Sequence, residues 1–477
     1  MLDRATAPSP HAVAGRQSLR DDLASALGAD RVSTSMALRE QHARGEGLPD
    51  AALPDIVVFP QTAGEVAAVA RLCSVALTPM IPFGAGTSLE GHLAALRGGV
   101  SIDLSRMNRI IEVSPQSMDC RVEAGVTRKT LNHAIRDTGL FFPVDPGADA
   151  SIGGMAATRA SGTNAVRYGT MRESVLGLTV VTPDGRIVRT GTRARKSAAG
   201  YDLTRLYVGS EGTLGIITEV QLRLQGIPEA ALTAVCQFDS LADAVSTVTL
   251  ALQMGLQLAR IELLDEVQMA ATIGYAGLDG FRPLPTLLME FHGSPASTRD
   301  EAATMEGLAA DQNGLGFHVA ATTEERERLW KARHDSYFAV MSLAPGKSNM
   351  GTDACVPIEM LAPCILETKR DIEESGLTAP IVGHVGDGNF HLGILFDPNS
   401  REERARADAL AYRVAERAIA MGGTCSGEHG VGLHKIRHMA SEHGEGVALM
   451  QAIKQALDPL MLMNPGKLLP QGDQNPL

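Results

Sequence analysis

The sequence predicts an α+β protein built from two large units, and three observations lead to this expectation. The chain has 477 residues, more than one hydrophobic core usually organises. Residues 79–226 consist of short β-rich runs interrupted by glycine turns, without the strand, G-x-G-x-x-G and helix that open a Rossmann domain. Near residues 226–229 the pattern changes, and a strand followed by an alanine-rich helix begins a second region.

The composition is typical of a soluble globular protein that does not bind nucleic acid. Hydrophobic residues make up 44% of the chain and charged residues 21%. The formal net charge of −12, without clustered Lys and Arg, opposes contact with a phosphate backbone. No run approaches the roughly eighteen apolar residues of a membrane span, and acidic residues near the N-terminus depart from a targeting peptide. We therefore expect a cytoplasmic protein, at most peripheral at a membrane, with residues 1–15 as a frayed tail.

The cysteines carry no pattern of a zinc thiolate site or a redox disulfide, because no Cys-x-x-Cys pair occurs. A free cysteine usually behaves as a small buried hydrophobe. Reduced, mostly buried thiols are therefore expected at Cys73, Cys120, Cys236, Cys355, Cys364 and Cys425.

Local patterns place the first elements of the chain. Residues 64–77 carry apolar positions at helical spacing, and Thr62 before them can cap a helix. Residues 56–59 and 100–104 are short apolar runs typical of strands. We divide the chain into a tail with a helical segment over residues 1–50, a unit over 51–228 and a unit over 229–470.

The second unit begins with a predicted strand at residues 232–238 and a predicted helix at 241–254. Further on, residues 400–420 form an amphipathic pattern whose polar face carries both charge signs. We expect a solvated surface helix there.

Glycine is the outlier of the composition, with 49 residues, and it is concentrated in five segments of the first unit. Glycine tolerates positive φ and lets backbone N–H groups converge on an anion, so such loops suit a pyrophosphate. One glycine-rich turn would be an ordinary packing feature, but five segments of the same chemistry indicate a cofactor cradle. They span residues 82–88 (PFGAGTS), 145–148, 151–154, 160–164 and 209–215.

These segments resemble the FAD-binding domain of the vanillyl-alcohol oxidase and p-cresol methylhydroxylase flavoproteins, over residues 54–228. The resemblance implies a two-part FAD-binding fold, with loop 82–88 at the pyrophosphate and the later loops along the isoalloxazine and the rest of FAD. Non-covalent FAD is expected, because no histidine lies in the four later loops, although His92 lies just past the first. The residues that the resemblance assigns to FAD are Pro82, Gly84, Ala85, Gly86, Thr87, Ser88, Pro146, Gly147, Ala148, Ser151, Gly153, Gly154, Ser161, Gly162, Asn164, Tyr168, Gly169, Glu211, Gly212, Gly215, Ile216, Ile217 and, in the C-terminal motif NPGK, Asn464.

Two histidines in the second unit frame a turn in the run HVGDGNFH, which extends from His384 to His391. On a straight strand this odd separation would put them on opposite faces, but a tight turn at Asp387-Gly388 brings them together. Two histidines and an oxygen ligand suit zinc, manganese or iron. Glu428, beside His429 in a glycine-bounded loop, is the candidate third ligand.

These motifs resemble the FAD-linked oxidase C-terminal domain of D-lactate, glycolate and D-2-hydroxyglutarate dehydrogenases, over residues 232–469. The resemblance implies an α+β domain with an antiparallel sheet and a divalent metal, zinc or manganese, on His384, His391 and Glu428. It also implies that Asn389 contacts substrate, Arg333 clamps the substrate carboxylate and His429 is the general base. Long runs such as PVDPGADASIGGMAATRASGTNAVRYGTMRESVL and GTCSGEHGVG are most similar to the mitochondrial type of D-lactate dehydrogenases.

The activity implied by the resemblance is oxidation of D-lactate, or another small D-2-hydroxy acid, by hydride transfer to flavin N5. Electrons would pass to cytochrome c, a quinone or an electron-transferring flavoprotein. D-2-hydroxyglutarate is disfavoured, because residues 348–353 lack the lysine expected for its distal carboxylate and Lys347 is offset. Glycolate or a longer D-2-hydroxy acid is the alternative within the family. A metallohydrolase and a non-catalytic flavin module are alternatives of other classes, and a homodimer is left open.

Overall fold

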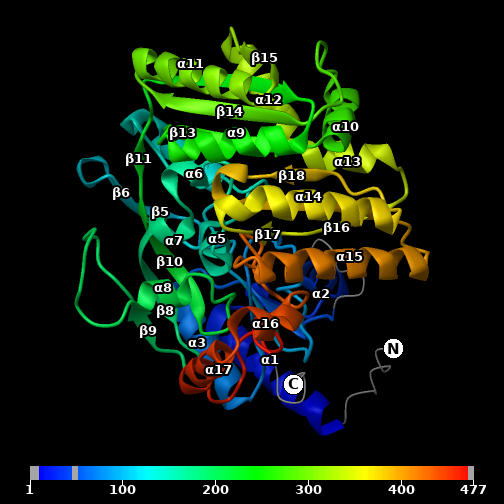
Figure 1. Ribbon diagram of the computed structural model, residues 1–477. Helices are drawn as coiled ribbons and strands as arrows, with labels where there is room; N and C mark the ends of the chain where they lie inside the picture. The colour runs from blue at the N-terminus through cyan, green and yellow to red at the C-terminus, as the bar shows by residue number, and fades with distance from the viewer. Residues whose placement is uncertain (1–9, 44, 46–51, 471–477) are drawn as a thin grey trace.

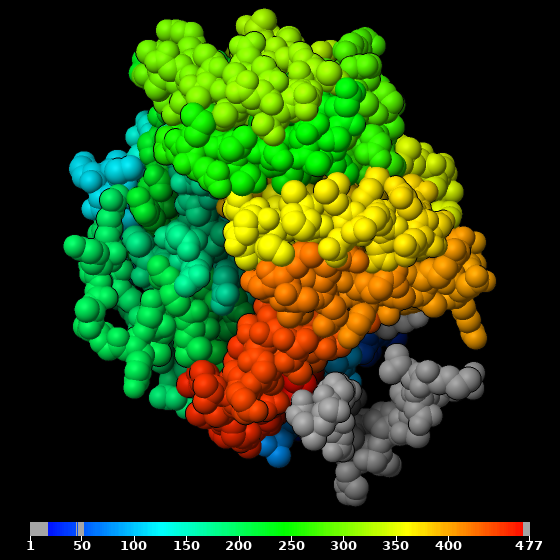
Figure 2. Space-filling view, in the orientation of Figure 1, coloured from blue at the N-terminus to red at the C-terminus, as the bar shows by residue number. Residues whose placement is uncertain are grey.

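The computed structural model describes residues 10–43, 45 and 52–470. Two sheets form the N-terminal half, one large sheet forms the C-terminal half, and the last helices return to the N-terminal half (Figure 1). The predicted α+β class is confirmed. In the space-filling view the green and yellow C-terminal half lies above the N-terminal half, with the orange and red segments packed beside both (Figure 2).

The first sheet is small and mainly parallel, in the order β1-β2-β4-β3. Its core is covered by α1 and α3, and Thr62 caps α3 as predicted, accepting the Glu65 N–H. The frayed tail predicted for residues 1–15 is wrong from Pro10 onward, because α1 begins there and buries leucines of its later turns against this core; residues 1–9 lie outside the described residues. The elements are α1 (Pro10–Leu27), β1 (Val32–Ser33), α2 (Met36–Ala43), β2 (Ile56–Val58), α3 (Ala63–Val75), β3 (Met80–Phe83) and β4 (Val100–Asp103).

The second sheet is antiparallel, in the order β5-β6-β10-β8-β9, and has its own hydrophobic core. The short helices α5 to α8 lie between its strands. The segment 151–154 begins α5, and the segments 145–148, 160–164 and 209–215 lie in the loops beside these helices. The elements are β5 (Ile110–Ser114), β6 (Asp119–Glu123), α4 (Arg128–Ile135), β7 (Leu140–Phe141), α5 (Ile152–Thr158), α6 (Ala165–Tyr168), α7 (Met171–Ser174), β8 (Val175–Val181), β9 (Ile187–Arg189), α8 (Leu203–Tyr207), β10 (Ile216–Arg223) and β11 (Gln225–Gly226), which pairs with β7.

The C-terminal half is built on an antiparallel sheet in the order β15-β12-β14-β13-β18-β19-β16, with β17 beside β19. Helices α9, α11, α14 and α15 bury one face of it in the largest core. The elements are β12 (Ala230–Phe238), α9 (Leu241–Gln253), β13 (Leu258–Leu264), α10 (Glu266–Ala276), β14 (Thr286–Gly293), α11 (Pro295–Asp311), β15 (Gly314–Val319), α12 (Thr323–His334), α13 (Ser336–Leu343), β16 (Ser348–Gly351), β17 (Ala354–Cys355), α14 (Ile358–Ser375), β18 (Ile381–Gly383), β19 (Asn389–Phe396), α15 (Arg401–Ala420), α16 (Met439–His443) and α17 (Gly446–Leu457).

Strand alternation decides which side chains of this sheet are available for chemistry. Ile261 and Leu263 of β13 belong to the core beneath the helices, so Glu262 between them points to the opposite face. In β19 Phe390 and Leu392 are in the same core, which puts His391 on that opposite face too. The face opposite the helical layer therefore carries the polar residues.

The last residues of the described chain add to the parallel sheet of the N-terminal half. Met463 bridges Met80 of β3, and the Asn464 N–H donates to the Met80 carbonyl at 2.8 Å. No helix within the described ranges is both long and apolar enough to cross a membrane. All six cysteines are free, and five are buried, with Cys355 partly exposed.

Candidate functional site

One cavity of about 1640 Å³ lies between the two halves and is lined by residues of both. The predicted site residues that line it are Pro82, Gly84, Ala85, Gly86, Thr87, Ser88, Pro146, Gly147, Ala148, Ser151, Gly153, Gly154, Gly162, Glu211, Gly212, Gly215, Ile217, Arg333, His384, His391, Glu428, His429 and Asn464. Those that do not line it are Ser161, Asn164, Tyr168, Gly169, Ile216 and Asn389. The five glycine-rich segments and the polar cluster of the second half thus share one space.

Close backbone packing explains why glycine occurs in the cradle. A Cβ at Gly84 would lie 2.4 Å from Ser151 Oγ, and one at Gly153 would lie 2.5 Å from the Ala124 Cβ. Ser151 also caps α5 by accepting the Gly154 N–H. The first and third segments therefore pack against each other at distances that larger residues would prevent.

Three of the residues outside the cavity wall hold the two halves together or fill a core. Asn164 donates its backbone N–H to Asp145 Oδ1 and accepts from Arg260 Nε, which comes from the second half. Tyr168 Oη lies 2.8 Å from His292 Nδ1, also in the second half. Ile216 is fully buried in the core of the parallel sheet. Asn164 and Tyr168 therefore act at the junction behind the cradle.

His384, His391 and Glu428 lie together on one side of the cavity. Glu428 Oε1 is 3.1 Å from His384 Nε2 and 3.3 Å from His391 Nε2, and these atoms form a group that could hold a metal ion. The two histidines meet because β18 and β19 form a hairpin in which Gly388 takes φ +75°. Burial alone would raise the pKa of Glu428. The two imidazoles beside it lower the pKa by more than burial raises it, so the carboxyl group is ionised.

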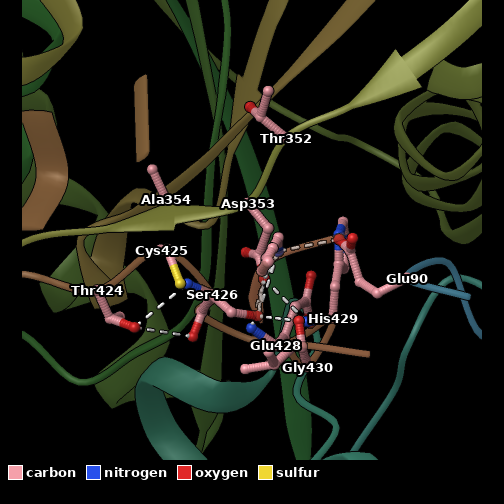
Figure 3. Close-up of polar contacts among 12 residues, drawn as sticks. Glu90, Thr352, Asp353, Ala354, Thr424, Cys425, Ser426, Glu428, His429 and Gly430 are labelled. Atoms are coloured by element: carbon pink, nitrogen blue, oxygen red, sulfur yellow. Dashed lines mark hydrogen bonds and ion pairs between the residues drawn. The ribbon is translucent and has the colours of Figure 1, made fainter. Parts of the chain in front are cut away.

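Asp353 organises the loop that carries Glu428 and His429 (Figure 3). Its Oδ2 accepts the backbone N–H groups of Glu428 and His429 at 2.9 and 2.8 Å, and also the Ser426 hydroxyl. Its Oδ1 accepts from Asn389 Nδ2, which also donates to the Ala354 carbonyl. Asn389, expected to contact substrate, is placed behind the wall as a support of Asp353.

His429 stacks on His391, with ring centroids 5.1 Å apart and an interplanar angle of 13°. Its Nδ1 lies 3.6 Å from Glu90 Oε1, which comes from the N-terminal half, and Glu90 is also 2.9 Å from Lys435 Nζ. Burial lowers the pKa of His429, but Asp353 and Glu90 reverse this effect and raise it above the ordinary histidine value. Nδ1 of His429 is thus directed at Glu90, and Nε2 is the ring nitrogen directed away from it.

Arg333 of α12 lines the cavity near His384 and is 9% exposed. Its Nε donates to Glu262 Oε2 at 2.9 Å, while Glu262 Oε1 lies 2.7 Å from His384 Nδ1. Burial alone would raise the pKa of Glu262. His384 and Arg333 lower the pKa by more than burial raises it, so Glu262 is charged. The Glu262 carboxylate therefore balances the charge of the Arg333 guanidinium group.

Glu211 links the fifth glycine-rich segment to the loop of His429. Its carboxylate accepts the Val431 and Gly432 N–H groups at 2.7 and 2.8 Å and lies 3.1 Å from His92 Nε2. Its carbonyl accepts from Asn464 Nδ2 at 2.8 Å. The C-terminal motif thus returns to the cavity, as the sequence predicted.

Sequence reasoning missed four buried charged residues that support the site: Glu90, Glu262, Asp353 and Lys435. For Glu262 a signal exists, because Arg260 and Glu262 alternate with apolar residues in the otherwise buried strand β13. Glu90 and Lys435 pair across the junction of the halves, and nothing in local sequence connects positions so far apart.

The chemistry available to this cavity follows from its two sides. Glycine-rich loops suit a phosphate-bearing cofactor, because their backbone can approach an anion closely. Opposite them, a charged arginine suits a carboxylate, two imidazoles with a carboxylate suit a divalent cation, and a further imidazole suits proton transfer.

Comparison with known proteins agrees with this division. The family model described as "FAD linked oxidases, C-terminal domain" matches residues 227–468, and that described as "FAD binding domain" matches residues 54–191. "Probable D-lactate dehydrogenase, mitochondrial" of Danio rerio is 51% identical, over 93% of this chain and 90% of that protein. "D-lactate dehydrogenase [cytochrome], mitochondrial" of Arabidopsis thaliana is 47% identical, over 88% of this chain and 74% of that protein.

Solved structures with the same fold are much more distant in sequence. The 4-ethylphenol oxidase from Gulosibacter chungangensis superposes with a TM-score of 0.78 at 18% identity, over 98% of this chain and 99% of that one. p-Cresol methylhydroxylase gives a TM-score of 0.74 at 17% identity, over 95% and 96%. The predicted p-cresol methylhydroxylase type of FAD-binding fold is confirmed.

The expected cytoplasmic location is wrong. The relatives from Danio rerio and Arabidopsis thaliana, and those from two yeasts, are named as mitochondrial proteins. These names point to mitochondria instead. The expectation relied on acidic residues near the N-terminus, and that composition does not decide location.

Proposed function

The chain belongs to the FAD-linked oxidases, and from this membership and the cavity we propose that it oxidises D-lactate to pyruvate. The observation that carries the proposal is that one cavity is lined by all the cradle loops and also by Arg333, His384, His391, Glu428 and His429. The names of the Danio rerio and Arabidopsis thaliana relatives support D-lactate as the substrate. Bound FAD would accept the two electrons of the oxidation.

Arg333 and His429 are the groups of this chain that we propose act on the substrate. Glu262 uses the Nε–H and one side of the Arg333 fork, so N–H groups remain to bind the substrate carboxylate in a charge-assisted pair. His429 holds Nδ1 toward Glu90 and presents Nε2 to take the proton of the substrate hydroxyl. The backbone N–H donors of the cradle loops would orient the cofactor.

A divalent cation, zinc or manganese, fits the group formed by His384, His391 and Glu428, because both imidazoles present Nε2 toward one ionised carboxylate. Such an ion would supply Lewis acidity to the substrate hydroxyl and lower its pKa. We predict that chelation abolishes flavin reduction by D-lactate and leaves FAD bound, since the cradle loops belong to the other half. Full activity of a protein shown to be metal-free by elemental analysis would contradict this.

We propose that FAD is bound non-covalently. We also propose that cytochrome c is the electron acceptor. His92 follows the first cradle loop in the sequence, and its Nε2 lies 3.1 Å from the buried Glu211 carboxylate. Acid precipitation should therefore release all the flavin as FAD. The word "cytochrome" in the name of the Arabidopsis thaliana relative supports the acceptor, and reduction of cytochrome c should outpace reduction of a soluble quinone.

The deciding experiment is anaerobic mixing of the purified protein with D-lactate, L-lactate, glycolate and D-2-hydroxyglutarate while flavin absorbance is followed. D-lactate should bleach the flavin with the highest efficiency. Lys347 lines the cavity but is paired with Glu403 at 3.0 Å, so a distal carboxylate would enter without a free lysine and lose several kcal/mol, on the order of the cost of an unpaired buried charge. Equal or faster bleaching by D-2-hydroxyglutarate, or by L-lactate, would overturn the assignment.

Glycolate remains the second candidate, because glycolate oxidase subunits of Bacillus subtilis and Escherichia coli are 32% and 30% identical to this chain. A metallohydrolase is disfavoured, because it would leave the cradle loops without a role. A colourless protein that reconstitution with FAD does not change would favour it.

A further inference from the structure

Glu262 is a fully buried carboxylate that contacts two groups of the site at once. Its Oε1 lies 2.7 Å from His384 Nδ1, and its Oε2 lies 2.9 Å from Arg333 Nε and 2.5 Å from Arg333 Nη2. The residue is 0% exposed and sits in β13, in the middle of the sheet. Each oxygen therefore serves a different functional side chain.

The contact with His384 sets which ring nitrogen can bind a cation. A carboxylate beside Nδ1 favours a proton on Nδ1, so the lone pair is on Nε2, the atom that faces Glu428 at 3.1 Å. A cation on Nε2 would polarise the ring and strengthen the Nδ1–H bond to Glu262. Occupation of the cation site would thus be felt at Glu262.

The contact with Arg333 sets how the guanidinium faces the cavity. Arginine has five N–H donors in a fixed plane, and Glu262 takes those of Nε and one of Nη2. The two N–H groups of Nη1 and the second N–H group of Nη2 then lie on the other edge of the guanidinium plane. Any movement of Glu262 would rotate that edge.

We propose that Glu262 is a positioning residue that couples cation binding at His384 to carboxylate binding at Arg333; this inference rests on the function proposed above. The coupling is reciprocal, so a 2-hydroxy or 2-oxo acid binds more tightly when the cation is present, and the cation binds more tightly when the acid is present. A carboxylate has two acceptor oxygens and can serve both partners. A glutamine amide has one, so it must present N–H either to His384 or to Arg333.

Glu290 offers a matched control in the same sheet. It lies on the neighbouring strand β14, is 3% exposed, and pairs with His292 Nε2 at 2.8 Å and Arg260 Nη1 at 3.8 Å. Glu262 and Glu290 are thus both buried acids between a histidine and an arginine. Only Glu262 contacts residues that line the cavity.

The test uses FAD-loaded protein that has been stripped of metal. Zn²⁺ affinity is measured by competition with a chromophoric chelator, and pyruvate affinity by the change in flavin absorbance, with and without Zn²⁺. In the wild type Zn²⁺ should tighten pyruvate binding by at least about 5-fold. Glu262→Gln should weaken Zn²⁺ binding by about 10- to 100-fold and lower the coupling factor, leaving only the part that comes from direct contact between the ion and the acid. Glu290→Gln should keep both wild-type values, and Glu262→Asp, which keeps two oxygens, should fall between.

Unchanged Zn²⁺ affinity and coupling in Glu262→Gln would overturn the proposal, as would equal losses in Glu290→Gln. If Glu262→Gln does not fold, the wild type and Glu262→Asp decide, and a wild-type coupling factor of one overturns the proposal. Flavin bleaching is read separately. A protein that no D-2-hydroxy acid bleaches, but whose Zn²⁺–pyruvate coupling falls well below the wild-type value in Glu262→Gln, would refute the proposed function and support the role of Glu262.

Discussion

His429 is held by contacts that reach it from both halves of the chain. Asp353 fixes its backbone, Glu90 fixes Nδ1, and the ring of His391 stacks on its face. These contacts remove the rotational freedom of the imidazole and leave one nitrogen free. Such preorganisation is what a general base requires, because proton transfer depends on geometry before pKa.

We predict that His429→Asn retains FAD and bound metal but slows flavin reduction by D-lactate by ~10²-fold, the usual contribution of a positioned base. His434→Asn is the control, since His434 contacts the other oxygen of Glu90 at 3.3 Å and is far more exposed. It should have a much smaller effect. Rapid mixing under anaerobic conditions measures both rates, and a wild-type rate in His429→Asn would move proton removal to another group.

The hairpin of β18 and β19 is the element that brings His384 and His391 together. Its turn depends on Gly388, where φ is +75° and a Cβ would lie 2.1 Å from the Val356 carbonyl oxygen. A left-handed conformation alone costs roughly 1–2 kcal/mol for a residue with a side chain. The contact with Val356 adds to that cost and would displace the turn.

Gly388→Ala should therefore lower the unfolding temperature and weaken Zn²⁺ binding, while FAD binding is retained. Gly277→Ala is the matched control, because Gly277 has φ +61° at the end of α10 but nothing within 4 Å of the added Cβ. Gly277→Ala should lower the stability only by the cost of the left-handed backbone conformation, and it should keep the wild-type Zn²⁺ affinity. Calorimetry and metal titration check this, and equal shifts in the two variants would show that the Val356 contact does not matter.

In the molecule as a whole, buried polar contacts join the two halves that line the cavity. Glu211 accepts N–H groups from Val431 and Gly432, while Glu90 pairs with Lys435. The segment after α17 then pairs with β3 through the bridge between Met463 and Met80. The cofactor loops and the loop of His429 are therefore positioned as one unit.

Glu211→Gln should weaken this junction, because an amide has one acceptor oxygen where the carboxylate serves two backbone N–H groups. One buried N–H would lose its partner, which costs about 1–3 kcal/mol. The variant should unfold at lower temperature and lose FAD more readily. Glu219→Gln, on a partly exposed strand position that accepts from Thr179, should stay within about 0.5 kcal/mol of wild type. A Glu211→Gln protein with wild-type stability and FAD retention would show that the junction does not depend on this carboxylate.

Elements and motifs whose causes are local could be predicted from the sequence. Hydrophobic periodicity and a capping threonine indicated α3, the change of pattern after residues 226–229 indicated β12, and the Asp-Gly pair indicated the turn between His384 and His391. Repeated small-residue loops indicated the cradle, and most of their predicted residues line the cavity.

The residues that support those motifs could not be predicted, because folding brings them from distant parts of the chain. Glu262 lies 122 residues before His384, and Glu90 lies 345 residues before Lys435, so neither pair follows from local spacing. Asn389 belongs to a quoted motif, yet its amide is directed to Asp353 and not to the cavity. The physical reason is that a buried charge must find its partner wherever the folded chain brings one, and the order of the sheet strands, not distance along the sequence, sets that choice.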